Sequence, residues 1–168
     1  MANPQDPQKP AAEAPRVAEM VGATSEPFFL GSQPTEITLA MHAPTGPAAS
    51  HKALSEMEVY LYIENLTCSK EAPPFRVYLN LPRGDAPEQH PELLVGNLGT
   101  FGVKKASDPE GPRGGNGLSF TVDLTDAVPR LIASKNWDPR NLRVTFSRGY
   151  WEGEVPQVKV GRVSLYFK

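Results

Sequence analysis

The sequence has few of the residues that build disulfide scaffolds or metal centres, and it lacks long apolar runs. Its 168 residues include one cysteine, Cys68, and three histidines. One cysteine cannot form a disulfide within the chain, so a disulfide-stabilised scaffold is excluded and a reducing compartment is favoured. No apolar run approaches the ~20 residues that a membrane-spanning helix needs.

The sequence also lacks a large excess of either charge. The chain carries 17 Lys and Arg against 19 Asp and Glu, a net charge of −2, without a long run of either sign. This balance gives neither the basic surface typical of nucleic-acid binding nor a polybasic cluster for an anionic membrane. The N-terminus has no charged stretch followed by an apolar one, as a secretory signal would. We therefore expect no nucleic-acid or membrane partner, and a cytoplasmic location is favoured.

Proline and glycine, in contrast, are abundant. Eighteen prolines and 14 glycines are too many for a mainly helical protein and are typical of an all-β domain with many turns. The length leaves room for one domain with a real core. We expect residues 1–18 to be a disordered Pro/Ala-rich linker or tail, and residues 19–168 to form a single β-sandwich domain. Both a natural protein and a domain excised from a longer one fit this composition.

Apolar and polar residues alternate in several segments, which is the pattern of half-buried antiparallel strands. These segments are 28–30, 37–41, 57–66, 75–81, 118–124, 142–146 and 158–167. A further strand is expected over 93–103, bent at its glycines. In the last strand the apolar positions change phase across Gly161, which predicts a bulge there.

One short helix is expected near 126–136. Thr125 or Asp126 can cap its first turn, Pro129 is tolerated in that turn, and apolar residues follow at helical spacing. About eight strands and one short helix predict an all-β fold, an antiparallel β-sandwich of jelly-roll type.

Five segments, in this order and spacing, resemble a known domain. They are Glu19-Met20-Val21-Gly22-Ala23-Thr24, Phe75-Arg76-Val77-Tyr78-Leu79-Asn80, Leu98-Gly99-Thr100-Phe101, Leu142-Arg143-Val144-Thr145-Phe146 and Val158-Lys159-Val160-Gly161-Arg162-Val163. Together they resemble the β-rich C-terminal domain of tyrosinases and polyphenol oxidases, the type 3 copper enzymes, in its bacterial form. The second segment keeps only the Phe and Val of the plant enzymes' Lys-Phe-Asp-Val strand. The third is similar to the family's Ala-Gly-Ser-Phe.

The resemblance implies a role beside a copper enzyme. In the family this domain packs over the entrance to the dicopper site and shields it until it is removed or displaced. The expected partner is thus a tyrosinase-like catalytic domain, in cis or in trans, which holds the copper. The resemblance also allows an aid to folding or copper loading.

The histidine count argues against catalysis by the chain itself. A type 3 centre needs six histidine imidazoles, and this chain has only His42, His51 and His90. We therefore expect no catalytic residues and no cofactor in this chain. A mononuclear copper site from these histidines and Cys68 is a weaker alternative, because imidazole and thiolate suit copper.

Two loops are candidate interfaces. Tyr150 and Trp151 lie beside Arg148 between two predicted strands, and exposed aromatics with arginine are typical interface anchors. Trp151 could equally fold back over the end of the sandwich. The loop 104–117, which contains Arg113 and Asn116, is long for a connection in a compact domain, and such loops are often functional. Beside the capping hypothesis stands a second one, a stand-alone β-sandwich module that binds protein or carbohydrate.

Overall fold

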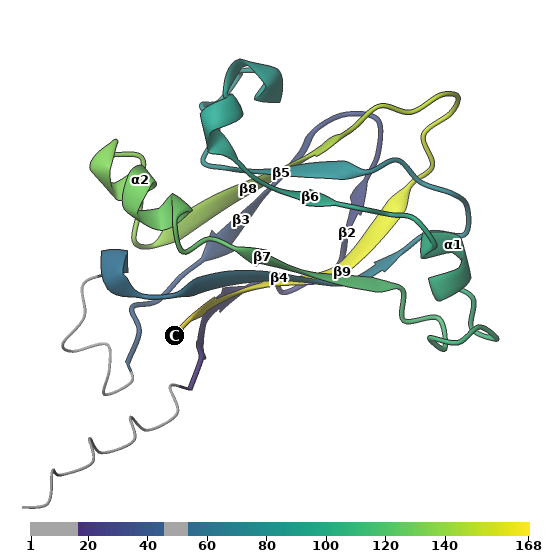
Figure 1. The fold of residues 1–168 in the computed structure, drawn as a ribbon, viewed down its shortest axis with the longest axis horizontal. Helices are drawn as coiled ribbons and strands as arrows, with labels where there is room; N and C mark the ends of the chain where they lie inside the picture. Colours follow the sequence, from purple (N-terminus) through teal and green to yellow (C-terminus); the bar gives the residue numbers. More distant parts are fainter. Residues whose placement is uncertain (1–16, 46–53) are drawn as a thin grey trace, which may run out of the picture.

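Two antiparallel sheets pack face to face in the computed structural model, which describes residues 17–45 and 54–168 (Figure 1). The first sheet has the order β1 (Glu19–Ala23), β9 (Val158–Phe167), β4 (Val59–Thr67) and β7 (Leu118–Asp123), and β2 (Phe28–Leu30) also pairs with β9. The second has the order β3 (Thr35–Ala40), β8 (Asn141–Arg148), β5 (Phe75–Leu79) and β6 (Leu94–Leu98).

The chain crosses repeatedly between the two sheets, so that β9 lies between β1 and β4, and β8 lies between β3 and β5. This is the strand order of a jelly roll, to which the three-residue β2 is added. The predicted antiparallel β-sandwich is therefore confirmed. Neither helix in the described part of the chain is long and apolar enough to span a membrane.

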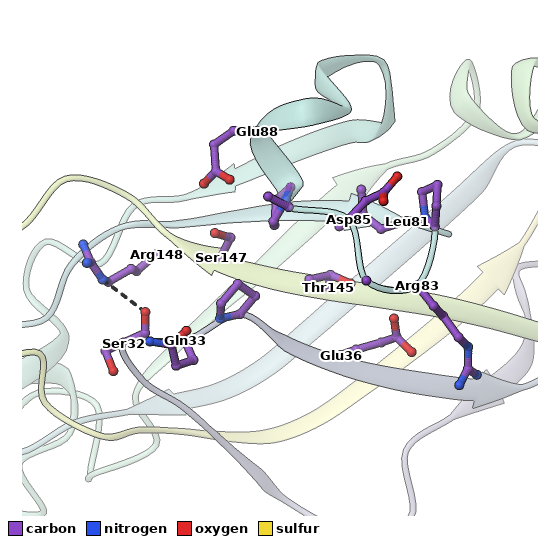
Figure 2. Close-up of a pocket in the computed structure, with 15 residues that line it drawn as sticks. Ser32, Gln33, Glu36, Leu81, Arg83, Asp85, Glu88, Thr145, Ser147 and Arg148 are labelled. Carbon is purple, nitrogen blue, oxygen red and sulfur yellow. Dashed lines mark hydrogen bonds between the residues drawn. The ribbon is translucent and has the colours of Figure 1, made fainter.

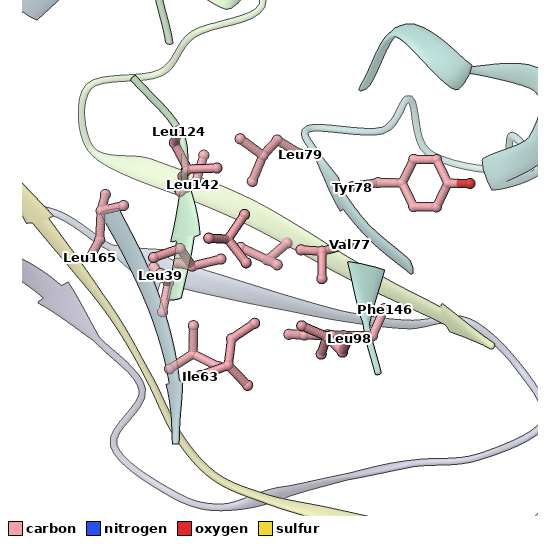
Figure 3. Close-up of a cluster of buried hydrophobic side chains, with 14 of the residues drawn as sticks. Leu39, Ile63, Val77, Tyr78, Leu79, Leu98, Leu124, Leu142, Phe146 and Leu165 are labelled. Atoms are coloured by element: carbon pink, nitrogen blue, oxygen red, sulfur yellow. The ribbon is translucent and has the colours of Figure 1, made fainter. Parts of the chain in front are cut away.

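The core fills the space between the sheets. Figure 3 shows side chains from both sheets meeting there, among them Leu39, Ile63, Leu142 and Leu165, all 0% exposed. Because side chains alternate across a strand, the inward positions are those that the sequence pattern identifies. Tyr78 instead points away from this cluster and is still 3% exposed. The outer face of the second sheet is therefore also partly covered.

The buried positions of β9 change phase in mid-strand, as the sequence predicts, but the predicted bulge at Gly161 is wrong. β9 pairs with β4 in one unbroken register along its whole length. β4 makes the same change of phase at Asn65, whose φ of 56° is left-handed. The irregularity consequently falls between β4 and β7. Glycine is required at 161, because a Cβ there would lie 2.8 Å from the Cβ of Asn65.

The predicted strand over 93–103 is too long. β6 ends at Leu98, and the chain then turns and enters α1 (Val103–Ala106), a helix that the sequence analysis missed. Gly102, with φ of 82°, allows this turn. The strand β1 was likewise not predicted as a strand.

The other helix, α2 (Ala127–Ala133), begins where it was expected and ends earlier than predicted. Asp126 occupies the N-cap position, but its side chain makes no capping bond. Thr125 instead accepts a hydrogen bond from the amide of Val59 at 3.0 Å. The helix ends in a Schellman motif with Lys135 at φ 60°, so it cannot extend to 136.

Candidate functional site

One aromatic side chain stands out from the surface. Phe101 is 98% exposed, although it lies between Thr100, which is 3% exposed, and Val103, which is 0% exposed. Burying a phenylalanine side chain contributes ~1.5–3 kcal/mol, so an almost fully exposed ring leaves that stabilisation unused. An exposed aromatic ring of this kind is a candidate interface anchor.

The turn that carries Phe101 is held on both sides. The Thr100 hydroxyl donates a hydrogen bond of 2.8 Å to the buried carbonyl of Ala72. The amide of Val103 donates to the carbonyl of Thr100 at 3.0 Å, and α1 starts directly afterwards. With Thr100 and Val103 buried and bonded, the backbone of this turn presents the ring outward.

Tyr150 and Trp151 leave the sandwich at the same end. The pairing of Phe75 with both Leu98 and Arg148 places the exits of β6 and β8 beside the start of β5. In Figure 1 the segments that follow these two strands both lie at the right-hand end. We call this end, with Phe101, Tyr150 and Trp151, the aromatic end.

The two predicted aromatic anchors differ in exposure. Tyr150 is 79% exposed, and its hydroxyl donates a 2.7 Å hydrogen bond to Glu152. This bond, together with partial desolvation, raises the pKa of Tyr150. Trp151 is half-buried, and its Nε1 donates to the carbonyl of Glu154 at 3.3 Å. Trp151 thus folds partly back, while Tyr150 remains available to a partner.

The remaining predicted interface residues are exposed as well. Arg148 donates through Nε to the carbonyl of Ser32 at 3.2 Å. Arg113 and Asn116 lie in the connection between α1 and β7, where the carbonyl of Asn116 accepts a 3.0 Å bond from the side chain of Asn65. Their roles as interface residues stay a prediction.

The metal-site candidates do not come together. His42 is exposed, with Nδ1 3.1 Å from the carbonyl of Ala43, and Cys68 is buried, with Sγ 3.5 Å from the carbonyl of Gln157. His51 lies outside the described residues. Within residues 17–45 and 54–168, no three His, Cys, Asp or Glu side chains are grouped as a metal site requires.

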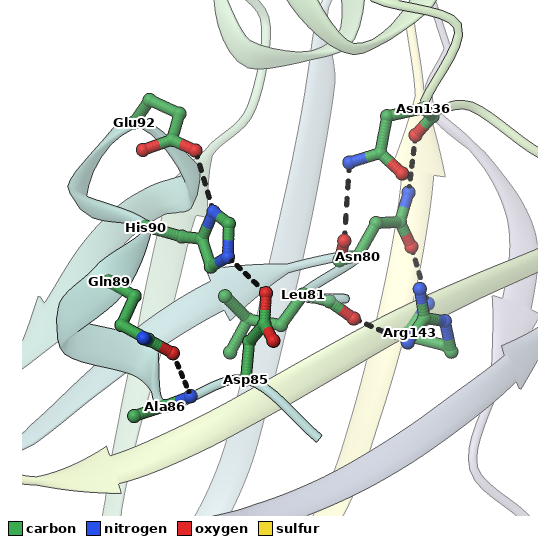
Figure 4. A network of polar contacts seen from close by, with 9 residues as sticks. All are labelled: Asn80, Leu81, Asp85, Ala86, Gln89, His90, Glu92, Asn136 and Arg143. Atoms are coloured by element: carbon green, nitrogen blue, oxygen red, sulfur yellow. Dashed lines mark hydrogen bonds and ion pairs between the residues drawn. The ribbon is translucent and has the colours of Figure 1, made fainter. Parts of the chain in front are cut away.

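His90 has a different environment, in which two carboxylates flank its ring (Figure 4). Its Nε2 lies 2.8 Å from Asp85 Oδ2 and its Nδ1 lies 2.9 Å from Glu92 Oε1. Both ring nitrogens can donate only in the imidazolium form. These bonds to Asp85 and Glu92 accordingly raise the pKa of His90, and the contact lowers the pKa of Glu92. His90 therefore ties together the segment that leaves β5.

The sequence does not identify Phe101 as a candidate, because the residue lies within the predicted strand 93–103. The glycines on either side of Thr100-Phe101, Gly99 and Gly102, are the signal that could have revealed a turn. The exposure of the ring itself has no sequence signal.

Comparisons with known proteins agree with this geometry. The family described as Domain of unknown function (DUF7868) matches residues 17–168. A tyrosinase from Hahella sp. (strain CCB-MM4) is 30% identical over 162 residues, which cover 94% of this chain and 34% of the relative. The resemblance to a tyrosinase-associated domain is thus confirmed.

Solved structures share the fold at lower identity. Latent apple tyrosinase matches with a TM-score of 0.53 and 19% identity, over 84% of this chain and 27% of that one. Recombinantly expressed latent aurone synthase, a polyphenol oxidase, matches with a TM-score of 0.51 and 12% identity, over 81% and 24%. The chain therefore spans about a third of the curated relative and about a quarter of each solved chain.

Proposed function

Because the chain belongs to the DUF7868 family and is similar to about a third of a tyrosinase, we propose that it is a non-catalytic domain that covers and regulates a type 3 dicopper catalytic domain. The catalytic domain would be joined to it in cis or bound to it in trans. The two solved structures compared above are both of latent enzymes, which favours a role in keeping an oxidase inactive until the domain is displaced.

The observation that carries the proposal is the rigidly presented ring of Phe101. A cap must bind tightly enough to compete with substrate, and it gains affinity when little has to be ordered on binding. The turn around Phe101 is already fixed by the bond of Thr100 to Ala72. The exposed Lys104 and Lys105 on α1 lie next in sequence and add a polar rim to this apolar centre.

The chain's own donors do not fit a copper centre. Both nitrogens of His90 contact carboxylates, and the thiol of Cys68 is buried. With three histidines in the whole sequence, six imidazole ligands cannot come from one chain. In our proposal, copper and its chemistry belong to the catalytic domain, and this chain only covers that domain.

The test uses the purified chain and the catalytic domain of the tyrosinase with which it occurs. Oxidation of a diphenol is followed while the chain is added, and complex formation is measured by size-exclusion chromatography. We expect saturable inhibition that parallels formation of the complex. An unchanged oxidation rate together with no complex would refute the proposal.

A further inference from the structure

A groove of about 600 Å³ lies on the outer face of the second sheet, remote from the inter-sheet core (Figure 2). β3 and β8 form its floor, and the segment 81–88 forms a wall. Cross-strand pairing places Glu36 opposite Thr145, and Arg76 opposite Ser147, so these side chains share the outer face. The groove is large enough for a small organic ligand.

Two hydroxyl groups in the floor are unpaired. Thr145 is 4% exposed and Ser147 is 6% exposed, and both line the groove. Neither side chain makes a hydrogen bond to any residue that the structure describes. Their hydroxyl oxygens are not among the side-chain polar atoms that are sealed from solvent without a partner, so they reach the groove and are available to a ligand in it.

The groove carries charges of both signs. Arg83 and Arg148 line it together with Glu36, Asp85 and Glu88, and Asp85 is also hydrogen-bonded to the ring of His90. An anion would meet the carboxylates, and a cation would meet the guanidinium groups. No aromatic side chain lines the groove among the described residues, so it does not suit stacking with a phenolic ring.

The wall is held in place before any ligand binds. Arg143 donates a 2.6 Å hydrogen bond to the carbonyl of Leu81, and Asn80 and Asn136 exchange side-chain to backbone bonds of 2.9 and 3.2 Å (Figure 4). The bond of His90 to Asp85 closes the other end of the segment. A preformed wall lowers the entropic cost of binding.

We propose that this groove binds a neutral saccharide. Each sugar hydroxyl both donates and accepts a hydrogen bond, which matches floor hydroxyls of the same kind beside guanidinium donors and carboxylate acceptors. The groove borders the aromatic end at Arg148, but Phe101, Tyr150 and Trp151 do not line it, so the inference goes beyond the capping role and does not depend on it.

The experiment titrates the full chain with neutral malto-, cello-, xylo- and chito-oligosaccharides, followed by calorimetry and by NMR shifts. We expect at least one class to bind. Thr145→Val and Ser147→Ala should each weaken that binding by about three- to tenfold, as loss of one neutral hydrogen bond does. Thr121→Val, the same change at an exposed position of β7 in the other sheet, is the matched control and should leave binding unchanged.

Stability gives a second readout. Because the Thr145 hydroxyl has no protein partner, Thr145→Val should fold normally and match or exceed the wild-type melting temperature. Four results would each overturn the proposal. Two concern the wild type: no binding of any sugar, or stronger binding of sulfate or phosphate than of any sugar. The other two are equal weakening of binding by Thr121→Val and clear destabilisation by Thr145→Val. Inhibition of the oxidase is measured separately, so failure here leaves the capping test unaffected.

Discussion

Truncation of Phe101 separates a binding role from a folding role. In Phe101→Ala the free energy of unfolding should change by no more than ~0.5 kcal/mol, because the ring is 98% exposed and has almost no contacts to lose. If the ring is buried against the catalytic domain, its removal should cost ~1.5–3 kcal/mol of binding free energy. This corresponds to an inhibition constant about 10- to 150-fold weaker.

The matched control is a phenylalanine in the core. Phe146 is 1% exposed and lies among the side chains between the sheets (Figure 3). Phe146→Ala should lower the free energy of unfolding by ~3–5 kcal/mol, because it leaves a cavity that the sandwich cannot close. Replacing phenylalanine by alanine should thus weaken inhibition with little loss of stability at position 101, and should lower stability at position 146.

Two assays decide the outcome. Urea denaturation gives the free energies of unfolding, and titration of diphenol oxidation gives the inhibition constants. Phe101→Ala that inhibits as well as wild type would refute the idea that the aromatic end is the contact surface, even if the chain still caps the enzyme. Strong destabilisation by Phe101→Ala would show that the ring is packed in solution and would refute the structural premise.

Two further predictions concern stability. His90→Gln removes a cation held between Asp85 and Glu92. Because the pKa of His90 is raised in the folded state, protonated His90 stabilises the fold fully below about pH 6.5, and this stabilisation is lost as pH rises through the folded-state pKa. The wild type should therefore exceed the variant most between about pH 4.5 and 6.5, where His90 is protonated and Glu92 is ionised, and urea denaturation across pH that shows a constant gap would contradict this. Gly117→Ala should destabilise by at least ~2 kcal/mol, because φ is 77° and a Cβ would clash with a carbonyl of β4. Gly99→Ala, where a Cβ meets nothing within 4 Å, is its control, and equal melting temperatures of the two variants would contradict the prediction.

Much of the fold follows from local pattern. The alternation in β4 and β8 predicts their buried faces, because a period of two has only one way to point apolar side chains inward. The start of α2 was found from Thr125, Asp126 and Pro129, although the expected capping bond is not made. These features depend on neighbours in sequence, and composition alone already favours a sandwich.

The polar–apolar sequence pattern gave wrong predictions where contacts between distant segments determine the local structure. The bulge predicted at Gly161 is absent because β4 shifts phase beside it at Asn65, and only the pairing of two strands shows this. The strand predicted through Phe101 is broken because Thr100 bonds to Ala72, 28 residues away. The apolar character of Phe101 suggested burial, whereas its position on a turn puts it in solvent.

An all-β sandwich, the likeness to a tyrosinase domain and the shortage of histidines for a dicopper centre can all be read from the sequence. The surfaces that are available to partners become visible only in the folded chain. Exposure of Phe101 and the unpaired hydroxyls of Thr145 and Ser147 depend on how remote strands and loops cover each residue. Hydrophobic periodicity reports which side of a strand faces inward, but contact between distant segments is a property of the packed chain.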